Sequence, residues 1–143
     1  MNSSEIKNSI LENAIEAARL NGVIHETFKH RDEGPEKREE WRLACEEFHA
    51  RYDMLSFPGG YTGSLERIAA GDAHSIEAAI CFVELRPYFF RSGYMYDSLI
   101  RKLKRAAFSR SQAARFAAVL ERRAAWKNRK AISQPSEMKA KLD

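Results

Sequence analysis

The sequence predicts an all-α protein, a single-domain bundle of about six helices, with stacked helix pairs of the α-solenoid kind as the alternative. Every long apolar pattern repeats with the helical period, and none alternates strictly as a strand does. Glycine and proline fall between these patterns, where helices end. No fixed repeat length is evident, so the α-solenoid is the weaker interpretation. At 143 residues the chain can bury one core.

The chain begins with two predicted helices. The first is expected over residues 4–21 and should end at Gly22, a typical C-terminal signal. A polar connector, residues 23–34, precedes Pro35, which opens the second helix in its first turn, where a missing N–H does no harm. The second helix carries the cleanest apolar stripe of the chain: Trp41, Cys45, Phe48, Tyr52 and Leu55.

Turn and capping signals separate the next two helices. Residues 57–61, Phe-Pro-Gly-Gly-Tyr, must form a turn. Ser64 can cap a short third helix that Gly71 closes. Asp72 can cap a fourth helix, which lasts until Pro87. These signals predict two short helices joined by a tight turn.

Two basic helices follow. The fifth is expected over residues 93–106, with Ser92 as its cap. Ser109 and Gln112 form a capping box, in which each side chain bonds to the backbone N–H of the other. The sixth helix should continue from there to about Lys130.

The helical stripes predict one core within residues 1–131, the expected helical domain. Residues 132–143 carry no apolar period and are expected to form a flexible C-terminal tail. The core should consist mainly of large apolar residues from the stripes: Trp41, Phe48, Tyr52, Ile76, Ile80, Leu99, Leu103, Phe116 and Leu120.

Charge is divided unevenly along the chain. Residues 1–85 carry 9 Lys or Arg and 16 Asp or Glu, a balance of −7, whereas residues 86–130 carry 13 Lys or Arg against 2 acidic residues, a balance of +11. An asymmetry of this size indicates an acidic or anionic partner for the basic half. The alternative is that the two halves neutralise each other within the fold.

The cations of the fifth and sixth helices lie opposite the apolar stripes on a helical wheel. Arg115, Arg122 and Arg129 recur at every seventh residue, in a row with roughly 10 Å between neighbours. Trp126 follows Arg122 by four residues, within reach of a cation–π contact. The predicted partner-binding residues are Arg91, Arg101, Lys102, Arg105, Arg115, Arg122, Trp126 and Arg129.

We expect the partner to be an acidic protein, because opposite charge patches speed docking and fix its register. The most concrete version is an immunity protein that neutralises a toxin domain. The alternative is nucleic acid, bound by the basic fifth and sixth helices. The structural interpretation of the same residues is a solvated basic face that makes the helix soluble or pairs with acidic neighbours in the same fold.

The compartment follows from what the sequence does not contain. No run approaches the roughly 20 apolar residues of a membrane helix, and the first residues do not read as a secretory signal, so we expect no membrane partner. Cys45 and Cys81 are too few and too far apart for a disulfide framework. A cytoplasmic, reducing compartment is expected.

Aromatic residues cluster between the fourth and fifth helices. Five of the 15 aromatics of the chain fall within residues 88–96. A base-stacking platform is one interpretation, because single strands favour aromatics interleaved with arginines. The stronger one is structural: Pro87 forces a corner, and Phe89 and Phe90 can fill the core. Arg91 is the residue that such a rigid corner would present to a partner.

Four segments are typical of turns and corners: FPGG at residues 57–60, GD at 71–72, PYFFRSGY at 87–94 and LKRA at 103–106. Together they resemble a group of small all-helical bacterial proteins, over residues 40 to 130. The resemblance implies a helical bacterial protein, and it implies no activity.

Metal-binding patterns are weak. His25 and His30 look like a zinc-binding helix motif, but their spacing of five residues turns the second histidine about 140° away from the first. Cys45 and His49 could supply two ligands from one helix face, but no others are evident. We therefore expect neither a metal nor another cofactor.

One pair of residues resembles a nuclease motif. Arg42 and His49 share a face of the second helix, and helical nucleases of the HEPN type use an arginine followed four to six residues later by a histidine. Leu43 replaces the polar residue that usually follows the arginine. We expect the protein not to be an enzyme, with a HEPN-like ribonuclease as the remote alternative.

Overall fold

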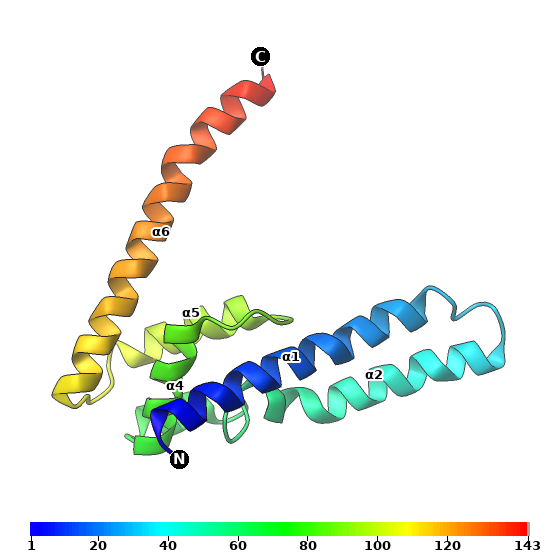
Figure 1. The fold of residues 1–143 in the computed structure, drawn as a ribbon, viewed down its shortest axis with the longest axis horizontal. Helices are drawn as coiled ribbons and strands as arrows, with labels where there is room; N and C mark the ends of the chain where they lie inside the picture. The colour runs from blue at the N-terminus through cyan, green and yellow to red at the C-terminus, as the bar shows by residue number, and fades with distance from the viewer. Residues whose placement is uncertain (143) are drawn as a thin grey trace. The chain divides into compact units, whose positions relative to one another are not determined.

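The computed structural model describes the backbone of residues 1–142 and the side chains of residues 1–131. Helices joined by turns make up this part of the chain, which contains no strand, so the all-α prediction is confirmed. None of the described helices is both long and apolar enough to cross a membrane. The helices are α1 (Ser3–Phe28), α2 (Pro35–Ser56), α3 (Ser64–Ala69), α4 (Ala73–Leu85), α5 (Ser92–Leu103) and α6 (Arg110–Leu142) (Figure 1).

The chain divides into two compact units. Unit 1, Met1–Ala107, holds α1 to α5, and unit 2, Phe108–Asp143, holds α6. The boundary between them falls immediately before the capping box of α6, and the single helical domain that we expect over residues 1–131 stays a prediction.

α6 is longer than the sequence predicts. It runs to Leu142, past the expected end near Lys130. Glu, Met, Lys, Ala and Leu make up residues 137–142, and all are good helix formers. The side chains of residues 132–143 lie outside the described part, so the flexible tail that we predicted there stays a prediction.

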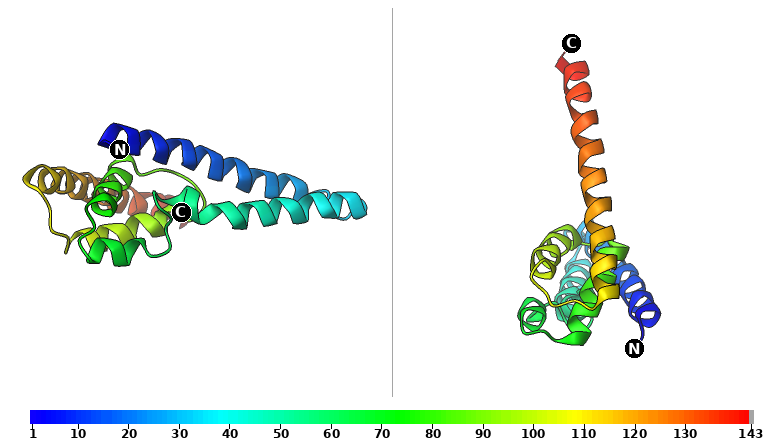
Figure 2. Two further views of the ribbon diagram at one scale, coloured as in Figure 1. Left: turned by 90° about the horizontal axis from the view of Figure 1, so that it is seen from below. Right: turned by 90° about the vertical axis from the view of Figure 1, so that its left-hand side faces the viewer.

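α1 and α2 lie side by side as an antiparallel pair, as Figure 1 and Figure 2 show. The prediction that Gly22 ends the first helix was wrong, because α1 continues to Phe28. The half-buried Ile24 and Thr27 extend its packed side beyond the glycine, and tertiary packing overrides a weak local propensity. Only residues 29–34 of the predicted connector lie outside the helices.

Three predicted helix starts are confirmed. Pro35 is the first residue of α2. The Asp72 carboxylate accepts the backbone N–H of Ser75 at 2.9 Å and caps α4. At the start of α6, the backbone N–H of Ser109 donates to Gln112 Oε1 and the backbone N–H of Gln112 donates to Ser109 Oγ, both at 3.1 Å. The predicted capping box is therefore formed.

Two predicted serine caps were wrong, and for the same reason. In α3 the cap is Gly63, with φ +82°, and Ser64 is fully buried. In α5 the cap is Arg91, with φ +66°. The Ser92 hydroxyl instead accepts the backbone N–H of Phe89 at 3.1 Å, behind the helix start. In both helices a left-handed residue makes the turn one position before the serine.

α4 is the centre of the core in unit 1. Every residue from Ser75 to Val83 except Glu77 is buried, as expected for a helix that is apolar nearly all round.

Burial is confirmed for six of the predicted core residues: Phe48, Ile76, Ile80, Leu99, Leu103 and Phe116.

The other three predicted core residues, Trp41, Tyr52 and Leu120, are only half-buried. Trp41 lies near the free end of the α1–α2 pair, where its ring meets the edge of Phe28 at 5.8 Å. In α6 the fully buried position is Val119, one residue before Leu120. The predictions failed because the sequence does not show where a packed helix face runs out.

Many charged side chains of α1 and α2 form ion pairs with each other. The Glu16 carboxylate of α1 accepts hydrogen bonds from Arg19 at 2.5 Å and from Arg51 of α2 at 3.1 Å. Arg51 also contacts Glu47 at 3.2 Å. The hydrogen bond from Arg19, opposed by partial desolvation and helped by Arg51, lowers the pKa of Glu16 to about 2.

A Glu16→Gln substitution should change how stability depends on pH. Because the folded pKa lies below the unfolded value, the carboxylate stabilises the fold above about pH 4.5 and loses that contribution as pH falls toward 2. We expect the free energy of unfolding of the wild type to fall more steeply than that of the variant over this window. Urea unfolding at a series of pH values measures it, and parallel pH profiles would contradict the account.

Candidate partner-binding site

α5 separates an apolar side from a basic side. Its buried side consists of Met95, Tyr96, Leu99, Ile100 and Leu103, which face the core of unit 1. The opposite side and the residues that flank the helix are mostly exposed. We call this side the α5 surface. Its basic, aromatic and polar residues are Arg91, Tyr94, Ser98, Arg101, Lys102, Lys104 and Arg105, and the exposed Asp97 is the acidic residue on the same side.

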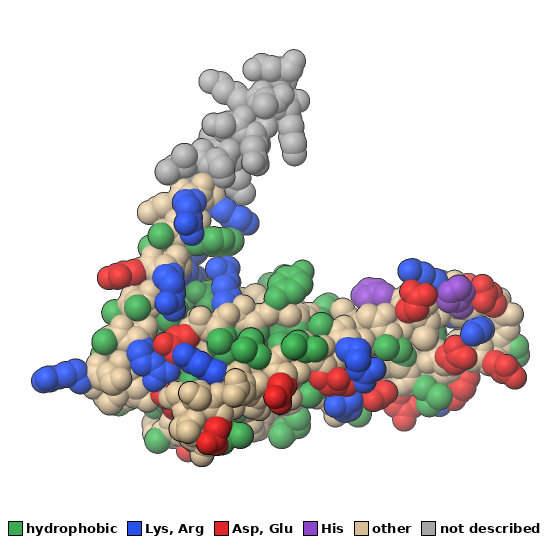
Figure 3. Space-filling model, viewed as in Figure 1, with side chains coloured by type: hydrophobic (Ala, Val, Ile, Leu, Met, Phe, Trp, Pro, Cys, Tyr) green, Lys and Arg blue, Asp and Glu red, His purple; other side chains and the backbone are tan. Residues whose placement is uncertain are grey.

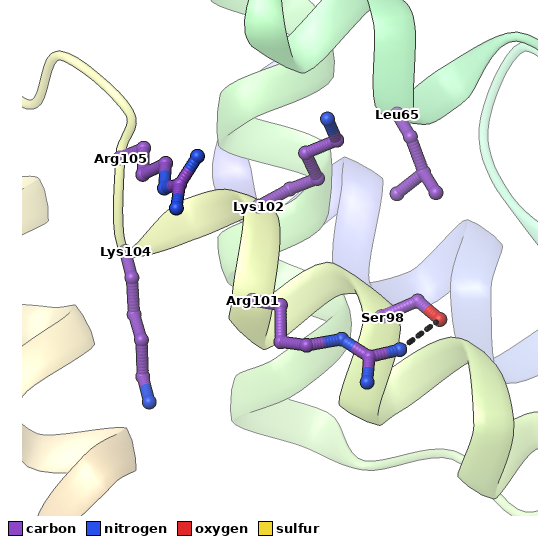
Figure 4. A pocket seen from close by; sticks show the side chains of 6 residues that line it. All are labelled: Leu65, Ser98, Arg101, Lys102, Lys104 and Arg105. Atoms are coloured by element: carbon purple, nitrogen blue, oxygen red, sulfur yellow. Dashed lines mark hydrogen bonds between the residues drawn. The ribbon is translucent and has the colours of Figure 1, made fainter.

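The C-terminal part of the α5 surface borders an open depression of about 400 Å³ (Figure 4). Leu65 of α3 supplies an apolar wall. Arg101 lies beside Ser98 and donates to its hydroxyl at 3.3 Å, whereas Lys104 extends along the other side of the helix end. The residues that line the depression are Leu65, Ser98, Arg101, Lys102, Lys104 and Arg105.

The four Lys and Arg residues that line the depression differ from the cations of residues 1–85, many of which form ion pairs. On α2, Arg42 is held between Glu39 at 2.6 Å and Glu46 at 2.7 Å, and Lys7 of α1 contacts Glu84 of α4 at 3.3 Å. Acidic and basic side chains alternate over the α1–α2 pair in Figure 3. By contrast, the cations of the depression, Arg101, Lys102, Lys104 and Arg105, form no ion pair with any residue whose side chain is described.

The dipole of α5 stabilises part of this positive charge. A cation in the last turn of a helix is stabilised by about 0.3–1 kcal/mol, but the effect is confined to that turn. Like charges at i, i+4, such as Arg101 and Arg105, oppose it by about 0.2–0.5 kcal/mol. Four unpaired cations around one depression therefore gain little from the fold itself, and an external anion would neutralise them.

An aromatic corner precedes α5. Arg86 and Arg91 bracket it, with φ of +48° and +66°, and no other described residue except glycine has a positive φ. Such backbone is strained by roughly 1–3 kcal/mol per residue and persists only when its surroundings enforce it. Burial raises the pKa of the Tyr52 phenol, which stays protonated and donates to the Phe90 carbonyl oxygen.

Some side chains of the corner are buried in the core, and others are exposed to solvent. Pro87 and Phe89 are buried, as the structural interpretation predicts. Phe90, which we also expected to fill the core, is 47% exposed, although its ring meets the edge of Phe48 at 6.0 Å. Tyr88 is 94% exposed. The sequence alone could not divide these residues, because three consecutive aromatics carry no helical period.

The structure brings together only half of the predicted partner-binding residues. Arg91, Arg101, Lys102 and Arg105 lie on the α5 surface of unit 1. Lys104, which helical spacing also places beside these cations, was not among the predicted partner-binding residues, and Tyr94 was missed as a member of this surface. The signal for Tyr94 was present, because Tyr94, Ser98, Arg101 and Arg105 follow each other at i, i+4, i+7 and i+11.

The other half lies on α6 in unit 2. Arg122 and Arg129 are exposed, but Arg115 is half-buried, so the row of every seventh residue is not uniformly accessible. The Lys130 ammonium lies over the Trp126 ring, 4.6 Å from its centroid, a contact that we did not predict beside the one that Arg122 has within reach. In a helix both positions are four residues from the tryptophan, and the sequence does not distinguish them.

The enzyme-like pair of the sequence analysis, Arg42 and His49, lies on α2. Glu39 and Glu46 hold the Arg42 guanidinium and raise its pKa, and His49 lies exposed on the same helix. Among the residues with described side chains, no three His, Cys, Asp or Glu come close enough to hold a metal.

Comparison of the chain with protein-family models, curated proteins and solved structures finds no match. The α5 surface and its surroundings therefore carry the functional inference.

Proposed function

We propose that this protein is a non-enzymatic bacterial binding module of the cytoplasm that docks an acidic protein through the α5 surface. One observation carries the proposal: Arg101, Lys102, Lys104 and Arg105 surround one depression and form no ion pair with a described residue. A cluster of this kind attracts an anionic surface and accelerates its association. Self-neutralisation of the two halves, the competing explanation, lacks the ion pairs that it needs at these four residues.

The composition of the α5 surface favours a protein over nucleic acid. Tyrosine and arginine are enriched in protein interfaces, and here Tyr94 and Arg91 continue the cationic surface toward the corner. Leu65 gives the depression an apolar wall, which suits an aliphatic or aromatic side chain next to a carboxylate. A phosphate backbone would use the cations alone.

Within this class, an immunity protein that neutralises a toxin domain is the most concrete version. Small size and a polarised charge distribution support it, because rapid and specific occlusion of one partner requires little more than a complementary surface. An adaptor or regulator would use the same surface. The identity of the bound protein distinguishes these versions.

Reversing two charges of the α5 surface should strongly reduce capture of the partner. We expect the wild type, immobilised and exposed to nuclease-treated lysate of its own host, to retain one acidic protein. Arg101→Glu combined with Arg105→Glu should retain at least about tenfold less, because like charges across an interface cost several kcal/mol. Quantitative mass spectrometry of the bound fraction measures the difference.

A matched control is available on α2. Lys37→Glu combined with Arg38→Glu changes the net charge equally at two exposed residues outside the α5 surface. Their ion pairs with Glu40 and Asp32 are exposed, so the fold should tolerate the change. Equal loss in both double variants would contradict the proposal. Capture of material from untreated lysate that is lost from the nuclease-treated lysate would favour the nucleic-acid alternative.

A further inference from the structure

The aromatic corner and the first turn of α5 present two tyrosines that the fold itself does not use. Tyr88 is 94% exposed and Tyr94 is 78% exposed. Neither ring contacts another aromatic ring or forms a hydrogen bond within the described part of the chain. Each ring leaves a large apolar area in water, which burial against a partner would remove.

The backbone beneath these tyrosines is fixed. The Phe89 ring is buried and meets Tyr52 at 6.3 Å and Phe82 at 6.2 Å. The Ser92 hydroxyl accepts the Phe89 N–H, and the Phe90 carbonyl accepts the Tyr52 phenol. A side chain held by a rigid backbone loses little entropy on binding, which is typical of residues that dominate an interface.

We infer that Tyr88 and Tyr94 are anchors that enter apolar pockets of the acidic protein partner, while the cations of the α5 surface face its acidic rim. This inference rests on the proposed function and names the surface features that the partner must have. Arg91 connects the two regions. In sequence it lies between the corner and the rest of the α5 surface, and its guanidinium lies 5.4 Å from the Phe90 ring centroid.

A base-stacking role fits this geometry less well. A stacking platform offers aromatic faces on which successive bases lie. Tyr88 and Tyr94 each stand alone and are almost fully surrounded by solvent, whereas a single protruding ring suits a pocket. Charge complementarity with the neighbouring cations makes the protein that carries the pocket an acidic one.

Photo-crosslinking in the host tests where the partner lies. A benzophenone amino acid replaces Tyr88 in the full chain, and a control chain carries it at Leu43, a 51% exposed residue of α2. We expect a covalent adduct with one acidic protein from position 88 and none with that protein from position 43. Adducts with nucleic acid, equal adducts from both positions, or no adduct from position 88 would overturn the inference.

Titration of the purified adduct partner then tests the anchor. Tyr88→Ala and Tyr94→Ala should each raise its Kd at least tenfold, at low and high salt alike, whereas Leu43→Ala should leave it unchanged. Both tyrosines are highly exposed, so circular dichroism melting should confirm that the variants fold normally. A change below twofold in both tyrosine variants would overturn the anchor role.

The two proposals fail in different ways. If Arg101→Glu/Arg105→Glu weakens binding and the tyrosine variants do not, the acidic partner stands and the anchors fall. If neither set weakens binding, both proposals fall. If only the tyrosine variants weaken binding and salt has no effect, the partner is not recognised by charge and the proposed function falls.

Discussion

Phe89→Ala is expected to destabilise unit 1 by about 3–5 kcal/mol, the range for deleting a buried phenylalanine ring. Phe89 is only 6% exposed, and its ring contacts Tyr52 and Phe82, which connect the corner to α2 and α4. The loss has a second consequence. The strained backbone at Arg86 and Arg91 persists only while the corner is anchored. The variant should therefore also allow residues 86–91 to leave this backbone conformation.

The neighbouring residue supplies the control. Tyr88→Ala removes a ring of similar size that is 94% exposed, so its stability should stay within about 0.5 kcal/mol of the wild type. Urea unfolding of both variants, followed by circular dichroism, measures the difference. Similar destabilisation of the two proteins would mean that the assignment of one ring to the core and the other to solvent is wrong.

Gly60→Ala should destabilise the turn after α2 by about 2 kcal/mol, since a left-handed conformation costs a non-glycine residue 1–2 kcal/mol. Gly60 has φ +90°, and an added Cβ would lie 2.8 Å from Asp53 Oδ2. That carboxylate has little freedom to move, because Asp53 Oδ1 accepts the backbone N–H of Thr62 at 2.8 Å and its hydroxyl at 2.7 Å. The substitution would therefore strain the backbone and disturb this contact.

Gly22→Ala should have the opposite effect. Gly22 lies inside α1, and nothing approaches within 4 Å of the position that a Cβ would occupy. Replacing a helical glycine by alanine gains about 0.5–1 kcal/mol. Thermal melting of Gly22→Ala and Gly60→Ala in the same buffer should show Tm values on opposite sides of the wild type. A lower Tm for Gly22→Ala would contradict the extended α1.

The parts of the fold that local chemistry specifies could be predicted from the sequence. Asp72 and the Ser109–Gln112 box act within one helical turn, so their residue types and spacing are sufficient evidence. The apolar period likewise placed Ile80 and Leu99 in the core. Gly22 shows the limit: its effect on α1 depends on packing against α2, which no local signal reveals.

The candidate site was only partly predictable for a related reason. Helical spacing identified Arg101 and Arg105 as neighbours on one face of a helix. It could not show that Leu65 of α3 completes a depression beside them, because that contact joins two elements separated along the chain. Nor could it show that Phe89 faces inward while Tyr88 faces solvent, since the corner has no regular period.

Hydrogen–deuterium exchange with and without the captured acidic protein tests the central claim most directly. The account predicts slower exchange over residues 86–105, the corner and α5, with no change over α2. Burial of a surface by a partner slows exchange of the backbone amides beneath it. Slowed exchange confined to α1 and α2, with residues 86–105 unchanged, would contradict the assignment of the α5 surface as the docking site.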